Sequence, residues 1–246
     1  MASGDYLDLA EMACRSAQLD PTDTTGDLVQ GKAKVNEAYL SVCHDGNPWD
    51  FLEKEGQWTC VAGSEQYTYA TIATGMSITG ASIREIVTMT NDTTGYLLRS
   101  MSWDQLEADS ASTQESGEGT GAPDSWSKWG SQAAPVVRLY PTPDAVYPLG
   151  PFCYLTPSEL SANVDTPLMP LAWRHRVIVP YAAALLLEQE GGSEAAGFYD
   201  RLMARYERNY IQMRTALATA KRPTFNVVAP DAFIDLPGSG ADWAYR

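Results

Sequence analysis

The 246-residue sequence predicts an α+β fold. Apolar residues recur at helical spacing over residues 4–19, 26–44, 171–190 and 194–220. Between these helix pairs, residues 57–156 contain short runs rich in β-branched and aromatic residues, separated by turn residues. We therefore expect an antiparallel helical bundle formed by the N- and C-terminal helix pairs, with an inserted small antiparallel β-sandwich or barrel and an extended C-terminal arm.

This pattern divides the chain into four predicted parts. The helical domain takes its N-terminal helices from residues 1–55 and its C-terminal helices from residues 169–222. Residues 56–168 form the inserted β domain, and residues 223–246 form the arm. The two helix pairs have to meet, because each carries an apolar stripe that it cannot bury alone.

The N-terminal helices are bounded by clear signals. Asp20-Pro21 ends the first, because the residue before a proline avoids the helical region. The second carries Leu28, Val35, Tyr39 and Val42 on one face. Trp49-Asp50-Phe51-Leu52 follows a turn, and we expect it to pack beneath the helices.

The middle of the chain predicts seven short strands and one loop. The strands are expected at residues 58–61, 66–72, 82–89, 96–100, 126–129, 136–140 and 152–156. Residues 107–124 have almost no large apolar side chain, which predicts a solvated loop.

The C-terminal helices carry most of the positive charge. Pro180 predicts a kink near residues 176–180, because it removes a backbone donor. In the last helix, four arginines lie off the apolar stripe: Arg201, Arg205, Arg208 and Arg214. Residues 171–222 hold 8 Lys and Arg against 5 Asp and Glu, whereas the whole chain has a net charge of −14. Such segregation suits a surface that meets an acidic neighbour, another copy of the chain included.

The final segment is unusually apolar for a tail. Its large side chains would each forgo roughly 1.5–3 kcal/mol of burial if left in water. Either the tail folds back on its own domain, or it docks on a neighbour as an arm. The expected arm anchors are Phe225, Val227, Val228, Phe233, Ile234, Leu236 and Trp243.

Signals of catalysis, cofactors and membranes are weak. The sequence has no nucleophile elbow, phosphate-binding loop, dinucleotide fingerprint or zinc-protease motif. We therefore predict no catalytic, cofactor-binding or metal-binding residues and no enzymatic activity. The four cysteines form no CxxC pair and are interpreted as buried thiols. No apolar run approaches the roughly 20 residues of a membrane helix, and the acidic N-terminus predicts no export signal. The negative charge argues against tight binding of nucleic acid.

A series of short motifs resembles the head-to-tail connector (adaptor, or neck) proteins of tailed bacteriophages. Val35-Asn36-Glu37-Ala38-Tyr39 stands ahead of Trp49-Asp50-Phe51-Leu52, as in the opening of that family. Further matches follow in order over roughly residues 26–215: Gln66-Tyr67, Gly121-Ala122-Pro123, Val137 to Asp144, Tyr147-Pro148-Leu149, Pro157 to Ser161, Asp165 to Pro170, and Tyr181-Ala182. The chain departs from the family at Tyr67-Thr68-Tyr69-Ala70, where a leucine-proline turn is usual.

The resemblance implies a structural protein of the virion neck that assembles in the host cytoplasm. Copies of the chain, twelve in the family pattern, would form a ring between the portal protein and a downstream neck or tail protein. Double-stranded DNA would pass through the lumen without specific binding. The four arginines would meet the portal or a neighbouring subunit, and the tail would be an interlocking arm.

Two other functions are kept as alternatives. The first is a different tail or neck component, whose β region would bind a ligand through Trp103, Trp126 and Trp129. The second is a cytoplasmic hydrolase that uses His175 as a general base, although the sequence offers no nucleophile or orienting carboxylate beside it.

Overall fold

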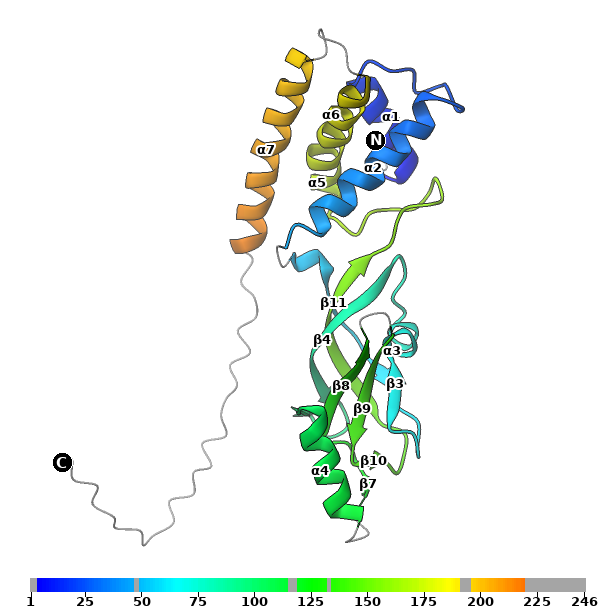
Figure 1. The fold of residues 1–246 in the computed structure, drawn as a ribbon, viewed down its shortest axis with the longest axis vertical. Helices are drawn as coiled ribbons and strands as arrows, with labels where there is room; N and C mark the ends of the chain where they lie inside the picture. The colour runs from blue at the N-terminus through cyan, green and yellow to red at the C-terminus, as the bar shows by residue number, and fades with distance from the viewer. Residues whose placement is uncertain (1–3, 47–48, 115–118, 132–133, 191–195, 220–246) are drawn as a thin grey trace, which may run out of the picture.

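The computed structural model describes residues 4–46, 49–114, 119–131, 134–190 and 196–219. The molecule is elongated, with helices at one end, sheets in the middle and a further helix at the far end (Figure 1). The predicted α+β class is confirmed. The helices are α1 (Tyr6–Ser16), α2 (Asp27–Cys43), α3 (Tyr69–Gly75), α4 (Trp103–Gln114), α5 (Leu171–Trp173), α6 (Val179–Glu190) and α7 (Ala196–Thr219), with a 3₁₀ turn η1 (Asp50–Leu52) and a π-helical turn η2 (Arg174–Ile178).

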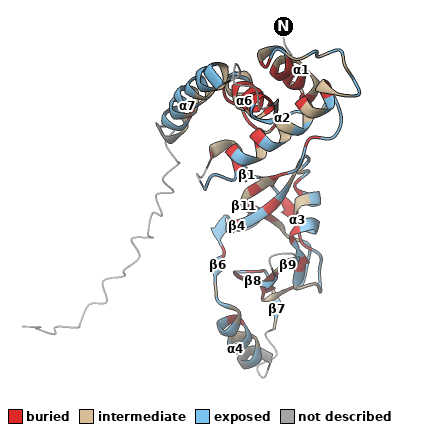
Figure 2. Cartoon of the chain, turned by 45° about the horizontal axis from the view of Figure 1, so that its top comes forward, coloured by how far each residue is buried: buried red, intermediate tan, exposed pale blue. Residues whose placement is uncertain are grey.

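The helical end is built around α6. Helices α1 and α2 pack on each other and on α6, while α7 packs on α6 and on η2. The α6 side chains Ala182, Ala183, Ala184 and Leu186 are almost completely buried, so α6 forms the centre of this core (Figure 2). The predicted α2 stripe is buried as expected, because Val35, Tyr39 and Val42 are each at most 1% exposed.

Helices α1 and α2 approach each other closely at Gly31. A Cβ atom at this position would lie 2.5 Å from Cys14 Sγ and 3.3 Å from the Ala10 carbonyl oxygen. Any larger residue would therefore push the helices apart. A glycine in the middle of a helix normally lowers the stability of the fold, and here the close packing of α1 on α2 that it permits offsets this loss.

The predicted packing of residues 49–52 beneath the helices is confirmed. Trp49 and Leu52 are each 2% exposed and belong to the helical core. The Trp49 indole donates a hydrogen bond of 2.9 Å to the Val42 carbonyl oxygen at the end of α2. This contact fixes the point at which the chain leaves the helices for the sheets.

Two sheets enclose the second core. One has the order β1-β11-β4-β5, with β2 also pairing with β11, and the other has the order β3-β9-β8-β6. Ile86 and Met89 of β4 meet Trp126 of β8 and Leu139 of β9 in one cluster. The strands are β1 (Glu53–Glu55), β2 (Trp58–Thr59), β3 (Gln66–Thr68), β4 (Ala81–Asn91), β5 (Tyr96–Leu97), β6 (Arg99–Ser100), β7 (Thr120–Gly121), β8 (Ser125–Ser131), β9 (Ala134–Tyr140), β10 (Thr142–Pro143) and β11 (Pro148–Pro157).

The pairing of these strands is antiparallel at β1/β11, β2/β11, β4/β11, β4/β5, β3/β9 and β8/β9. Two short pairs, β6 with β8 and β7 with β10, run parallel, which the prediction of an antiparallel sheet did not include. Register shifts interrupt the long β4/β11 pair near Cys153 and Leu155, and such irregularities bend a strand. The side chain of Leu168 packs against both cores and joins the helical end to the sheets.

Two predictions in the middle of the chain are wrong. Residues 66–72 were expected to be one strand, but β3 ends at Thr68, whose hydroxyl accepts a hydrogen bond from the Thr71 N–H and caps α3. The loop predicted over residues 107–124 is wrong in part, because residues 107–114 belong to α4 and Thr120–Gly121 form β7. Glu107 and Asp109 of α4 pair with Arg138 of β9 and Arg99 of β6.

Near Pro180, where the sequence predicts a kink, the backbone departs from regular α-helix. The π-helical turn η2 spans Arg174–Ile178 directly before α6. A π-helical turn is wider than an α-helical one, and its position here is consistent with the absence of a backbone N–H on Pro180. The boundaries of the four predicted parts stay predictions, and residues 223–246 of the arm lie outside the described residues.

Candidate functional site

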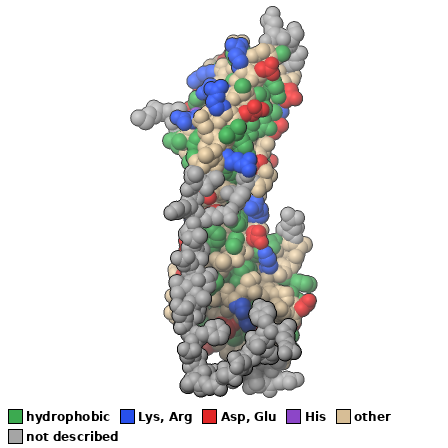
Figure 3. Space-filling model, turned by 90° about the vertical axis from the view of Figure 1, so that its left-hand side faces the viewer, with side chains coloured by type: hydrophobic (Ala, Val, Ile, Leu, Met, Phe, Trp, Pro, Cys, Tyr) green, Lys and Arg blue, Asp and Glu red, His purple; other side chains and the backbone are tan. Residues whose placement is uncertain are grey.

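Helix α7 presents one apolar side to the molecule and one cationic side to solvent. Leu202 and Met213 are buried against the helical core, and the ring of Tyr206 stacks on that of Tyr181 in α6. The opposite side of the helix is exposed. Viewed from this side, the molecule shows Lys and Arg side chains gathered over its helical end (Figure 3).

Three of the four predicted arginines share one line along this exposed side. Arg201, Arg205 and Arg208 are separated by four and three residues, which places them on the same side of a helix. All three are exposed, and within the described parts of the chain no ion pair joins them to a carboxylate. Arg201 lies over the Phe198 ring, 4.7 Å from its centroid. We call Arg201, Arg205 and Arg208 the arginine stripe.

Arg214 lies on another side of α7. It stands thirteen residues after Arg201, which is about 140° round the helix from it. Its guanidinium acts on Tyr210, whose pKa is raised by burial and by Asp45 and is lowered in part by Arg214. The four arginines therefore do not form a single patch. The spacing of Arg214 from the other three in the sequence is enough to show this.

Two other arginines of the basic segment, Arg174 and Arg176, contact groups of the protein itself. The Arg174 guanidinium donates hydrogen bonds to the carbonyl oxygens of Met169 and Gly4, at 2.7 and 3.2 Å. Arg176 lies over the Trp173 ring, 5.9 Å from its centroid. Among the described residues of this segment, α7 therefore carries four of the six arginines.

His175 has a carboxylate neighbour that the sequence analysis did not foresee. Its Nε2 lies 3.1 Å from Asp8 Oδ2, and the same oxygen accepts a hydrogen bond from the Gly4 N–H. The pair ties the start of α1 to η2. This arrangement gives His175 a structural role in holding two helical segments together.

The tryptophans of the β region do not form a common binding platform. Trp126 is 1% exposed and lies in the core between the sheets. Trp129 is 55% exposed, but its ring stacks on Trp103 with centroids 4.7 Å apart. The Arg138 guanidinium covers Trp103 at 5.2 Å from its ring centroid. Stacking of a ligand across all three rings is therefore excluded in this arrangement.

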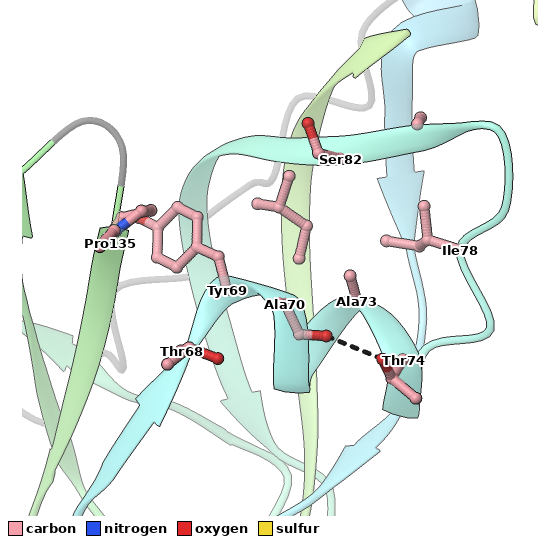
Figure 4. A pocket seen from close by; sticks show the side chains of 11 residues that line it. Thr68, Tyr69, Ala70, Ala73, Thr74, Ile78, Ser82 and Pro135 are labelled. Carbon is pink, nitrogen blue, oxygen red and sulfur yellow. Dashed lines mark hydrogen bonds between the residues drawn. The ribbon is translucent and has the colours of Figure 1, made fainter. Parts of the chain in front are cut away.

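A cavity of about 600 Å³ lies between α3, the start of β4 and the start of β9. The ring of Tyr69 points across it toward Pro135, and the Thr74 hydroxyl donates to the Ala70 carbonyl oxygen on its floor (Figure 4). None of the residues that line it carries a charge. Its hydroxyl groups therefore have no general base among the lining residues that could activate them.

The remaining predictions about sites concern membranes, metals and the arm. Among the described residues no helix combines the length and the apolar character needed to span a bilayer. In the same part of the chain, no group of three or more His, Cys, Asp or Glu side chains could hold a metal ion. The anchors Phe225, Val227, Val228, Phe233, Ile234, Leu236 and Trp243 lie outside the described residues.

In this α+β chain the described residues leave the arginine stripe without a carboxylate partner, and uncharged residues line the cavity beside α3. These are features of a structural subunit that binds other proteins. The family model of the SU10 adaptor protein matches residues 4–230, and the chain belongs to this family of bacteriophage adaptors. It is accordingly a structural component of the virion, and the resemblance noted in its sequence is confirmed. No curated protein matches the chain.

Proposed function

We propose that this protein is a head-to-tail adaptor that forms a ring beneath the portal and joins the capsid to the tail. The family match over residues 4–230 is the observation that carries this assignment. Its partners are further copies of the chain (twelve in the family pattern), the portal protein, and a downstream neck or tail protein. It acts in the virion neck after assembly in the host cytoplasm.

The arginine stripe supports a role in assembly. Guanidinium groups form strong paired hydrogen bonds with carboxylates, and here three of them face solvent on a chain of net charge −14. Their cost to the isolated protein is small because they are exposed, so they are available for a protein surface that carries acids.

The overall charge supports passage of DNA through the ring. Phosphates are repelled by acidic side chains over about 8–10 Å at physiological salt. A lumen lined by this chain would therefore let double-stranded DNA slide without specific binding. We further propose that the C-terminal anchors belong to an arm that docks on a neighbouring subunit.

The proposal is tested by supplying variants to a phage that lacks its own copy of the gene. Replacing Arg201, Arg205 and Arg208 by Glu is expected to leave a folded chain that no longer enters particles, so that heads remain without tails. Arg214→Glu is the matched control on the same helix. Protein with this substitution is expected to enter more particles than the triple variant does. Normal, infectious particles from the triple variant would contradict the assembly role of the stripe.

Deletion of residues 224–246 tests the arm separately. The shortened chain is expected to be soluble and folded but unable to assemble, because it lacks the apolar anchors. Electron microscopy of particles and immunodetection of the protein in them measure the outcome. If the shortened chain supports infectious particles, the arm is not required.

A further inference from the structure

The outer side of α2 carries a groove that no described part of the chain fills. Two adjoining hollows of about 560 and 590 Å³ share Val29 and Lys32. One wall is α2 and the other includes Tyr6, Glu159 and Ser161. We call the hollow between α2 and residues 159–161 the α2 groove.

The floor of the α2 groove has the spacing of a helix-packing seam. Val29, Ala33, Asn36 and Leu40 line it and recur at intervals of four, three and four residues. Such residues form one line along a helix, which is the surface on which a second helix packs. Val29 is 54% exposed and Ala33 is exposed, whereas Asn36 and Leu40 are half-buried, so the line is only partly covered in the single chain.

The charges around the groove suit a cationic partner. Glu37 and Glu159 line it and are both exposed. Lys32 also lines it and donates to Asn163 Oδ1 at 2.7 Å, so the lining holds two carboxylates against one ammonium group. Glu37 pairs with Lys34 at 2.8 Å, and because this pair is partly exposed it can exchange for an arginine of a partner. Residues 4–46 hold 8 Asp and Glu against 3 Lys and Arg, so this segment as a whole is acidic.

The arginine stripe and the α2 groove lie at opposite sides of the helical end. Helix α6 stands between α7 and α1 in both ribbon views (Figures 1 and 2), and α2 packs on α1 and α6. A chain with two complementary surfaces on opposite sides associates head to tail, and such contacts close into a ring when the rotation allows.

The two surfaces also match in length and in apolar content. From Arg201 to Ile211 α7 advances about 15 Å, and from Val29 to Leu40 α2 advances about 16 Å. Ile211 is three residues beyond Arg208 and is 62% exposed, an apolar side chain next to the cations. The floor of the groove offers Val29 and Leu40 as its counterparts.

We propose that the α2 groove of one copy receives α7 of the next copy, with Arg205 and Arg208 facing Glu37 and Glu159. Ile211 then packs on the apolar floor of the groove. This inference rests on the proposed adaptor function and names the surfaces that join neighbouring subunits in its ring. Each subunit uses its α7 once and its groove once, so every contact in the ring is the same.

Charge reversal on the full-length chain tests the pairing. Variant A carries Arg205→Glu and Arg208→Glu, and variant B carries Glu37→Arg and Glu159→Arg. Each variant alone opposes like charges at every contact, so its self-association is expected to weaken by roughly two orders of magnitude. An equimolar mixture of A and B restores opposite charges at every contact and is expected to assemble into alternating rings. Light scattering and native mass spectrometry, with only one variant isotope-labelled, measure the size and the alternation.

Arg214→Glu and Glu188→Arg serve as controls, because neither residue lies on the arginine stripe or in the α2 groove. Both control variants are expected to associate as the unmodified chain does, and circular dichroism checks that A and B remain folded. Each of three outcomes would overturn the inference. Variant A or B alone could associate as strongly as the unmodified chain, the mixture could fail to assemble, or the unmodified chain could stay monomeric.

The location of the protein in particles separates this inference from the adaptor function. Labelled protein found at the neck, together with rings that ignore the charge reversals, would refute the α2 groove and leave the adaptor function standing. Labelled protein found elsewhere in the particle would refute the adaptor function, whatever the reversals do to self-association.

Discussion

The ring of Tyr206 in α7 stacks on the ring of Tyr181 in α6, with centroids 4.4 Å apart and planes inclined by 17°. Tyr210, one turn further along α7, meets the edge of Trp49 and donates a hydrogen bond to Asp45. These contacts fix the rotation of α7 about its own axis. They thereby turn the arginine stripe toward solvent.

Tyr206→Ala is expected to lower the free energy of unfolding by about 2 kcal/mol, because it removes both the stacked ring and its partly buried area. Urea denaturation followed by circular dichroism measures the loss. Tyr206→Phe keeps the ring and is expected to cost less than about 1 kcal/mol. Equal losses in the two variants would assign the effect to the hydroxyl group and refute the role of stacking.

Gly31→Ala is expected to destabilise the protein by about 1–3 kcal/mol, although alanine is the better helix former. The added methyl group would lie 2.5 Å from Cys14 Sγ, a completely buried atom. Cys14→Ala removes that sulfur, so the loss caused by Gly31→Ala should shrink markedly in the double variant. A double-mutant cycle by thermal or urea denaturation decides this, and simple additivity would contradict the predicted clash.

Arg138→Met is expected to lower the free energy of unfolding by about 3 kcal/mol, because it leaves two carboxylates without their cation. The Arg138 side chain is 10% exposed and pairs with Glu65 at 3.2 Å and with Glu107 of α4. Glu107→Gln leaves the Glu65 pair in place and is expected to cost less. Hydrogen exchange should show faster opening of α4 in both variants, and unchanged exchange there would mean that Arg138 does not hold the helix.

The buried thiols predict a loss of stability at high pH. Burial raises the pKa of Cys43 to about 12 and that of Cys153 to about 11, from an ordinary value of 9.0. Since the folded state holds these protons more tightly than the unfolded state, its extra stability is complete below pH 9 and declines as the pH rises toward these values. Burial raises the pKa of Tyr206 to about 12, with the same sign.

Measuring the free energy of unfolding between about pH 8 and about pH 11 checks this prediction. The Cys43→Ala/Cys153→Ala variant is expected to be less stable at pH 8 but to lose stability less steeply as the pH rises. An identical slope in the variant and the unmodified chain would show that the thiols do not contribute.

Much of the helical end could be predicted from the sequence, because its signal is periodic and apolar. The α2 stripe of Val35, Tyr39 and Val42 and the burial of Trp49 were read correctly from spacing alone. Helix α4 was missed because Leu106 is its only fully buried apolar side chain among residues 103–111. Its stability comes from contacts with distant residues, Arg99 to Asp109 and Arg138 to Glu107, which no local pattern reports.

The strand expected over residues 66–72 failed for a different reason. Tyr69, Thr71 and Ile72 favour strands by type, yet they form α3. The Thr68 hydroxyl caps that helix, and Tyr69 and Ile72 are buried in the core between the sheets. A local cap and tertiary burial together outweighed the intrinsic preference.

The candidate interface was only partly readable from the sequence. Exposure of the arginines follows from their distance from the apolar stripe of α7, which is a local property of one helix. The position of Arg214 on another side of α7 also follows from helical geometry, although the sequence analysis grouped it with the other three arginines. The α2 groove was not readable, because its second wall comes from residues 159–161, more than a hundred positions away.

By itself, the sequence determined the long helices of the helical end, their buried stripes and the uneven distribution of charge along the chain. These depend on spacing within one element or on composition, so neighbouring residues suffice to specify them. Tertiary structure alone decided that α6 separates the cationic α7 from α1, that Glu159 lies beside Glu37 of α2 in one groove, and that Arg138 is enclosed between carboxylates. Such relations depend on how elements distant in sequence pack, because only close packing brings their side chains within reach of one another.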